Sequence, residues 1–83
     1  MSLPDDCDVD KLAEVALGLM YLTLHGDKSS TRAWKGMDWD VLNLLHERGW
    51  IGDPKSKAKS VPVTEEGEAL AERFFKKHFG RTE

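Results

Sequence analysis

The chain has 83 residues, a formal net charge of −3 and a single cysteine. This length allows one domain, and one cysteine excludes an intramolecular disulfide. Apolar residues make up 40% and charged residues 33% of the chain, as in a folded domain rather than a disordered one. The negative net charge gives no overall attraction to nucleic acid or to an anionic membrane, so such binding requires a local basic patch.

The first residues are acidic and predict a flexible tail over residues 1–7. Asp5 and Asp6 stand where a signal peptide has basic residues. The longest apolar stretch, residues 15–24, is shorter than the roughly 18 residues that a membrane span needs. We therefore expect a cytoplasmic protein with one domain over residues 8–80 and a C-terminal tail over residues 81–83.

Asp8 is placed to cap a first helix, which we expect to end at Gly26. From residue 15 onward this helix is apolar all round, because Leu17, Tyr21 and Leu24 lie opposite its main apolar stripe. A helix of this kind must be covered on both sides. Either a second copy of the chain covers Leu17, Tyr21 and Leu24, which predicts a homodimer, or the later hairpin and last helix wrap the first helix within one chain.

Residues 27–37 are polar and rich in turn formers, and we expect a single short helical turn there, over residues 30–35. Asp38 then caps a second helix, which stops at Gly49. Asp40 adds a negative charge to the first turn of this helix, where the helix dipole favours it.

Residues 50–51 predict a strand, residues 52–54 a turn, and the following S-V-P-V a second strand that leads into a helix capped by Thr64. Gly67 lowers the helix propensity by about 1 kcal/mol relative to alanine, and a close backbone approach to the hairpin would explain it. Gly80 ends this helix. The order predicts an α+β domain with three main helices and one two-stranded β-hairpin between the last two.

No set of residues predicts an enzyme, a cofactor or a metal site. His25, His46 and His78 lie on different elements without acidic or cysteine partners at ligand spacing. Asp38 and Asp40 are two residues apart on a helix and do not face each other as an acid and a base would. No nucleophile elbow, P-loop or dinucleotide-binding motif occurs.

Lys55, Lys57 and Lys59 alternate along the expected tip of the hairpin, so an extended loop would project all three to one face. They could neutralise DNA phosphates, or they could form a solvated loop that protects an edge strand. Further candidate nucleic-acid contacts are Arg32, Lys35 and Arg48.

Three tryptophans, Trp34, Trp39 and Trp50, are many for a chain of this length. Such large side chains bury much area in a core or an interface. A platform on which a ligand stacks is the alternative.

The segment L-L-H-E-R-G-W-I, the lysine-containing loop and V-P-V-T-E-E-G-E-A-L-A-E resemble the recognition helix, wing and final helix of bacterial winged-helix regulators. The regulators in question are the multiple-antibiotic-resistance repressor and phenolic-acid repressor types. This resemblance covers residues 38–79 and implies a winged-helix-like fold. The whole chain, with Y-L-T-L-H and R-A-W-K-G-M-D-W-D, resembles a family of small bacterial proteins of unknown function, which implies a shared fold without an activity.

Two departures from the regulators bear on function. A helix-turn-helix has a full helix before its recognition helix, and only residues 30–35 are available here. The recognition helix meets DNA with its N-terminal residues, where Asp38 and Asp40 would repel phosphates. We therefore favour a homodimeric, non-enzymatic interaction module with an unidentified protein partner, and the alternative is a nucleic-acid-binding transcriptional regulator that uses the basic loop.

Overall fold

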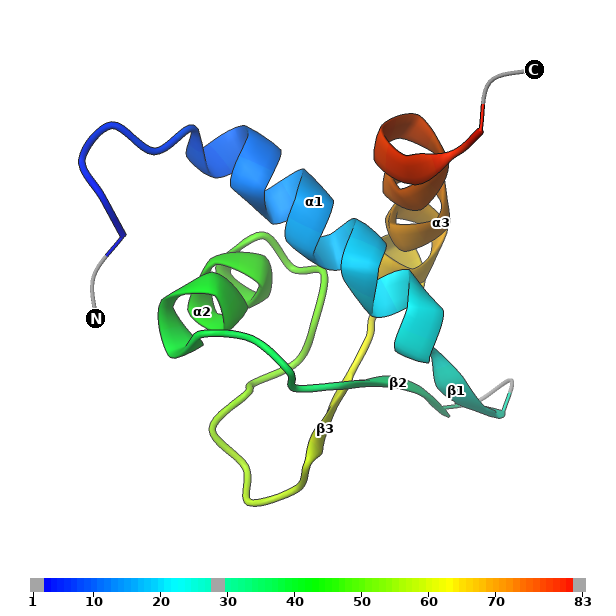
Figure 1. The fold of residues 1–83 in the computed structure, drawn as a ribbon. Coiled ribbons are helices and arrows are strands. Elements are labelled where there is room, and N and C mark those ends of the chain that lie inside the picture. The colour runs from blue at the N-terminus through cyan, green and yellow to red at the C-terminus, as the bar shows by residue number, and fades with distance from the viewer. Residues whose placement is uncertain (1–2, 28–29, 82–83) are drawn as a thin grey trace.

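The computed structural model describes residues 3–27 and 30–81 (Figure 1). Its elements in chain order are α1 (Val9–Met20), a 3₁₀ turn η1 (Tyr21–Thr23), β1 (His25–Asp27), β2 (Ser30–Trp34), α2 (Trp39–Glu47), β3 (Ser60–Pro62) and α3 (Glu65–Phe79). In Figure 1, α1 lies across the molecule between α2 and α3, with the strands below it. The predicted α+β class is confirmed, as are the three helices within the described residues.

The three strands form one antiparallel sheet in the order β1-β2-β3. The central strand, β2, pairs Thr31 with Gly26 of β1 and Ala33 with Val61 of β3. Ala33 and Val61 are both fully buried, so this pair joins the sheet to the core. The sheet therefore joins two strands that are neighbours in the sequence, β1 and β2, to the distant strand β3.

The short helical turn expected over residues 30–35 is wrong, because this segment forms β2. Its backbone is satisfied by long-range bonds: the N–H of Val63 donates to the carbonyl of Thr31 at 2.9 Å, and the N–H of Lys35 donates to that of Lys59 at 3.0 Å. The two strands of the expected hairpin meet only in an isolated bridge between Ile51 and Val63. Pairing with β2 thus replaces most of the predicted hairpin.

The helix starts follow the predicted caps. Asp8, Asp38 and Thr64 each accept a hydrogen bond from a backbone N–H in the first turn, at 3.1, 2.9 and 3.0 Å respectively. The first helix ends earlier than expected, at Met20. Gly26 is not its terminator but a residue of β1, where its φ of 112° suits glycine.

The first helix is covered within one chain. Leu17 is fully buried, and Tyr21 and Leu24 are half-buried against the core. The helix α3 crosses α1 so closely that a Cβ on Gly18 would lie 3.1 Å from the backbone nitrogen of Phe75. The assignment of Leu17 to a dimer interface is therefore wrong, whereas the homodimer itself stays a prediction.

We expect Leu17→Glu to unfold the protein, because it places an unpaired charge in the core, at a loss of about 4 kcal/mol or more. Leu22 is 66% exposed on the following 3₁₀ turn, and Leu22→Glu is the matched control, with a change within about 0.5 kcal/mol. Thermal unfolding followed by circular dichroism distinguishes them. A Leu17→Glu protein with an unchanged midpoint would contradict this packing.

The backbone of Trp50, just before the long loop over residues 52–59, meets the start of α3. We call this contact the Trp50 junction. The carbonyl oxygen of Trp50 accepts from the N–H of Thr64 at 3.0 Å. The hydroxyl of Thr64 lies 2.8 Å from the carbonyl oxygen of Gly49 and 3.2 Å from that of Trp50, so its one proton is donated chiefly to Gly49. A Cβ on Gly67 would overlap the carbonyl oxygen of Trp50. The close backbone approach predicted for Gly67 is confirmed.

Gly67→Ala should lower the free energy of unfolding by about 1–3 kcal/mol, because the overlap with the Trp50 carbonyl outweighs the gain in helix propensity. Gly36→Ala is the matched control, since a Cβ there meets no atom within 4 Å. Urea unfolding measures both. If Gly67→Ala proved as stable as the parent protein, the close approach would be refuted.

Candidate functional site

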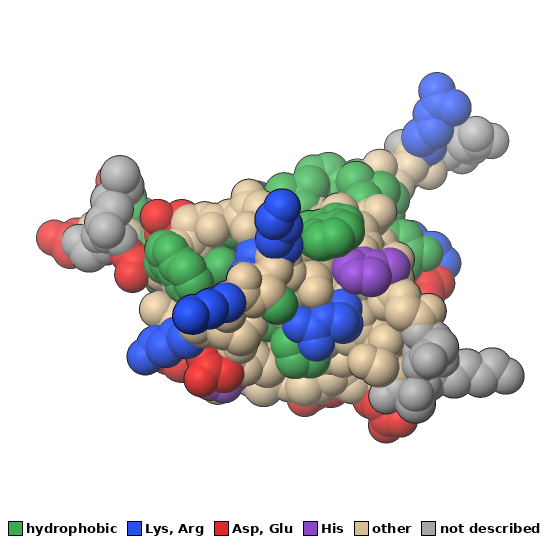
Figure 2. Space-filling view, turned by 90° about the horizontal axis from the view of Figure 1, so that it is seen from below, with side chains coloured by type: hydrophobic (Ala, Val, Ile, Leu, Met, Phe, Trp, Pro, Cys, Tyr) green, Lys and Arg blue, Asp and Glu red, His purple; other side chains and the backbone are tan. Residues whose placement is uncertain are grey.

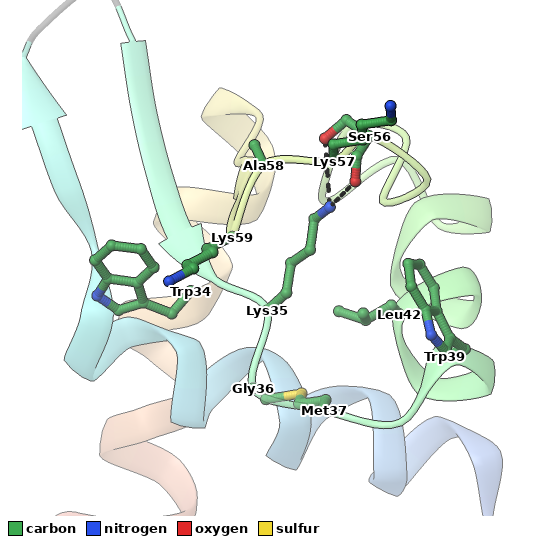
Figure 3. A pocket seen from close by; sticks show the side chains of 10 residues that line it. All are labelled: Trp34, Lys35, Gly36, Met37, Trp39, Leu42, Ser56, Lys57, Ala58 and Lys59. Carbon is green, nitrogen blue, oxygen red and sulfur yellow. Dashed lines mark hydrogen bonds between the residues drawn. The ribbon is translucent and has the colours of Figure 1, made fainter.

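An open groove of about 510 Å³ lies between the end of β2, the start of α2 and residues 56–59 (Figure 3). Trp34 and Trp39 stand on opposite sides of it, with Lys35 between them. Lys57 and Lys59 line it from the loop. Among residues 3–27 and 30–81, none of those that line the groove is acidic. The groove is therefore both cationic and aromatic.

The three tryptophans have different surroundings. Trp50 is 8% exposed and belongs to the core, whereas Trp34 is 51% and Trp39 is 55% exposed. The imidazole of His25 stacks on the indole of Trp34, with ring centroids 4.9 Å apart and an interplanar angle of 26°. The ammonium of Lys35 lies 5.9 Å from the ring centroid of Trp39, a cation–π distance. Both exposed indoles are thus supported by a neighbouring side chain.

The loop that carries the lysines is tied down at three points. Pro54 at its start is fully buried. The carboxylate of Asp53 accepts from the N–H of Lys55 at 2.9 Å. The ammonium of Lys35 donates to the carbonyl of Ser56 at 2.7 Å and to its hydroxyl at 3.3 Å. These contacts hold the loop against the rest of the groove (Figure 3).

The three loop lysines are exposed, but the loop is not extended. Residues 54–59 form a turn and bends, so the expected alternation to one face does not apply. Lys57 and Lys59 line the groove, and Lys55 does not. Figure 2 shows lysine and arginine side chains beside hydrophobic side chains and a histidine on the face seen from below.

The remaining candidate nucleic-acid contacts, Arg32 and Arg48, have different surroundings. Arg32 donates to the hydroxyl of Ser60 at 2.7 Å and to its carbonyl at 2.9 Å, which ties β2 to β3. Arg48 lies elsewhere: it pairs with Asp10 of α1 at 2.6 Å and sits over the Trp50 ring. Of the cations predicted to contact nucleic acid, Lys35, Lys57 and Lys59 line the groove.

His25 is the one groove neighbour whose role the sequence did not indicate. It pairs with Arg32 in the β1–β2 register, which places it diagonally across from Trp34. Only a predicted β1–β2 hairpin could have indicated that His25 lies beside Trp34. The sequence did not predict this hairpin, because the residues H-G-D of β1 have no strand propensity.

The acidic residues at the start of α2 are not part of the groove lining. Asp38 is engaged as the helix cap. Asp40 lines a different hollow together with Asn43 and Glu47, and one of its carboxylate oxygens is buried without a described partner. These carboxylates therefore leave the cationic lining of the groove unneutralised.

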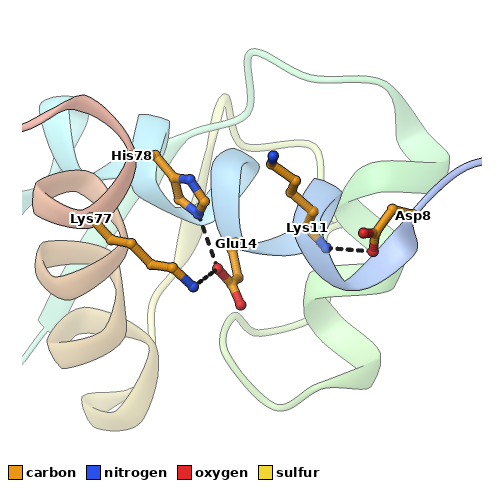
Figure 4. Close-up of polar contacts among 5 residues, drawn as sticks. All are labelled: Asp8, Lys11, Glu14, Lys77 and His78. Carbon is orange, nitrogen blue, oxygen red and sulfur yellow. Dashed lines mark hydrogen bonds and ion pairs between the residues drawn. The ribbon is translucent and has the colours of Figure 1, made fainter.

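A separate polar cluster joins α1 to the end of α3 (Figure 4). The carboxylate of Glu14 lies 2.9 Å from the ammonium of Lys77 and 3.0 Å from the imidazole of His78. Hydrogen bonds, from Lys77 first and then from His78, lower the pKa of Glu14 below its ordinary value of 4.5. Within residues 3–27 and 30–81, no three metal-binding side chains gather into a candidate site, and no helix has the length and apolarity to cross a membrane.

Because the pKa of Glu14 is lowered on folding, its contribution to stability is complete above 4.5 and is lost as the pH falls through the lowered value. Glu14→Gln should therefore lower the unfolding midpoint at neutral pH, and its difference from the parent protein should shrink in acid. Thermal unfolding across this pH range measures the difference. Asp5→Asn, in the exposed tail, is the control, and a Glu14→Gln effect of constant size would contradict a charge-dependent contribution.

Residues 8–81 match the model of a family described as "Domain of unknown function (DUF6429)". The chain belongs to this family. It is 43% identical over 76 residues to "Uncharacterized protein y4hR" of Sinorhizobium fredii (strain NBRC 101917 / NGR234), a match that covers 92% of this chain and 99% of that protein. No solved structure matches the chain. The groove and the Trp50 junction both lie within the segment matched to the DUF6429 family.

Proposed function

We propose that this protein is a non-enzymatic interaction module that binds an anionic partner in the groove between Trp34 and Trp39. One observation carries the proposal: two half-exposed indoles flank a groove whose charged lining residues, in the part of the chain that the structure describes, are lysines. Exposed apolar surface rimmed by polar groups marks interaction sites, and tryptophan is enriched among the residues that dominate binding energy. The positive charge of the lysines indicates that the partner is anionic.

The restrained loop supports a binding role. Buried Pro54 and the bonds from Lys35 to Ser56 already hold residues 54–59 in place before a partner arrives. A site that is ordered in advance loses less conformational entropy on binding. Open, pre-formed cationic surfaces suit an extended partner better than a deeply enclosed small molecule.

The chemistry of the lining supports binding over catalysis. Its described side chains are cationic, aromatic or apolar, apart from the hydroxyl of Ser56. Lys35 already donates to this hydroxyl. Neither a histidine nor a carboxylate is among the described lining residues to act as a base.

The alternative, a winged-helix-like transcriptional regulator of duplex DNA, has the basic loop in its favour. Two observations weigh against it. A strand, β2, precedes α2 where a helix-turn-helix has its first helix. Asp38 and Asp40 stand at the end of α2 that would meet the phosphates. We therefore rank the regulator of duplex DNA as the second candidate function and expect no sequence-specific DNA binding.

Chromatography on heparin, used as a polyanion probe, tests the anionic partner. Despite the net charge of −3, the protein should be retained at low salt. Lys57→Ala/Lys59→Ala should elute near the void, since the local lysines supply the attraction.

Lys11→Ala/Lys76→Ala is the matched control, because it removes two exposed lysines that do not line the groove. It should elute with the parent protein. Equal loss of retention in the two double variants would show that attraction is not localised at the groove, and a parent protein that flows through at low salt would overturn the proposal.

A further inference from the structure

We infer that the anionic partner is a single-stranded nucleic acid whose bases stack on Trp34 and Trp39 and whose phosphates contact the loop lysines. This inference rests on the function proposed above, because it names the partner of the same groove. It goes further by giving the indoles and the lysines separate roles, one toward bases and the other toward the backbone.

The two indoles are arranged as supported platforms. His25 stacks on the Trp34 ring with centroids 4.9 Å apart, and Trp34 still has 51% of its surface exposed, which leaves room for contact with a second aromatic ring. Trp39 is 55% exposed and lies at the first position of α2, where its backbone is fixed by the helix. Aromatic side chains of this kind bind single strands by stacking, which tolerates any base because every base has a π-face.

The loop lysines supply the second component. Lys57 and Lys59, the two loop lysines that line the groove, are exposed, and their ammonium groups form no ion pair or hydrogen bond with the described residues. Each can therefore neutralise one phosphate without first breaking an internal contact. Two such contacts on a single strand give a log–log salt slope of about −1.4.

The single strand is favoured over a duplex because bases within a duplex stack on each other and hide their faces from an indole. It is favoured over an acidic peptide because a peptide carboxylate would use Lys57 and Lys59 but leave both half-exposed indoles without an aromatic partner. The lining therefore fits a ligand that has anionic and aromatic groups in alternation along one chain.

The test is a tryptophan-fluorescence titration with oligothymidylate and oligouridylate of about 12 nucleotides, within the site sizes of single-strand binders. Both should quench the fluorescence and bind, and the comparison separates DNA from RNA as the preferred strand. Trp39→Ala should weaken binding about 5- to 100-fold, the loss expected for one stacked base. Trp39→Phe should retain most of it.

The matched ligand is an abasic oligonucleotide of the same length, which keeps the phosphates and lacks the bases. It should bind to the parent protein more weakly than the complete strand binds to Trp39→Ala, because it loses the stacking on both indoles and not on Trp39 alone. Since Trp39 is mostly exposed, Trp39→Ala should unfold at the same temperature as the parent protein, which separates loss of stacking from loss of fold.

Three outcomes would overturn the inference. Equal binding of the abasic and complete strands, or of polyglutamate, would leave the anionic partner of the proposed function standing but remove the role of the bases. Tighter binding of a duplex of equal length would promote the transcriptional regulator. Absence of binding to every polyanion, heparin included, would remove the proposed function together with the inference.

Discussion

The carbonyl oxygen of Trp50 fixes the relative position of the long loop, the sheet and the last helix. It accepts a hydrogen bond from the N–H of Thr64 and lies against the backbone of Gly67. The segment between residues 51 and 63, which contains the lysine loop and β3, is closed here, with the N–H of Gly52 donating to the carbonyl of Pro62 at 2.8 Å. Because a buried backbone group must be paired, this junction holds the end of β3, where the chain leaves its pairing with β2 and enters α3.

The groove depends on that closure. Once β3 lies beside β2, the loop lysines can face the stretch that connects β2 to α2, and Lys35 can reach Ser56. Trp34 ends β2 and Trp39 begins α2, so the two indoles are held by different elements. The groove is thus a product of long-range pairing between β2 and β3.

Local chemistry predicted the helices well, because caps and breakers act within a few residues: Asp8, Asp38 and Thr64 cap as expected. It failed at Ser30–Trp34, which has residues typical of a cap and becomes the central strand by pairing with β1 and β3. It also failed at Leu17, since an apolar face does not indicate whether its cover comes from the same chain or another. The loop cations were predicted, but their convergence with Trp34 and Trp39 depends on the tertiary fold.

One tryptophan lies in the core and two lie at the groove, so a measurement that resolves each indole tests the proposed binding site directly. Nuclear magnetic resonance of the ¹⁵N-labelled protein resolves each indole N–H as its own signal, and the protein has three tryptophans. On addition of a single-stranded oligonucleotide, the signals of Trp34 and Trp39 should shift together with the amides of residues 55–59, while that of Trp50 stays in place. Shifts confined to α1 and α3, with both groove indoles unchanged, would contradict the account.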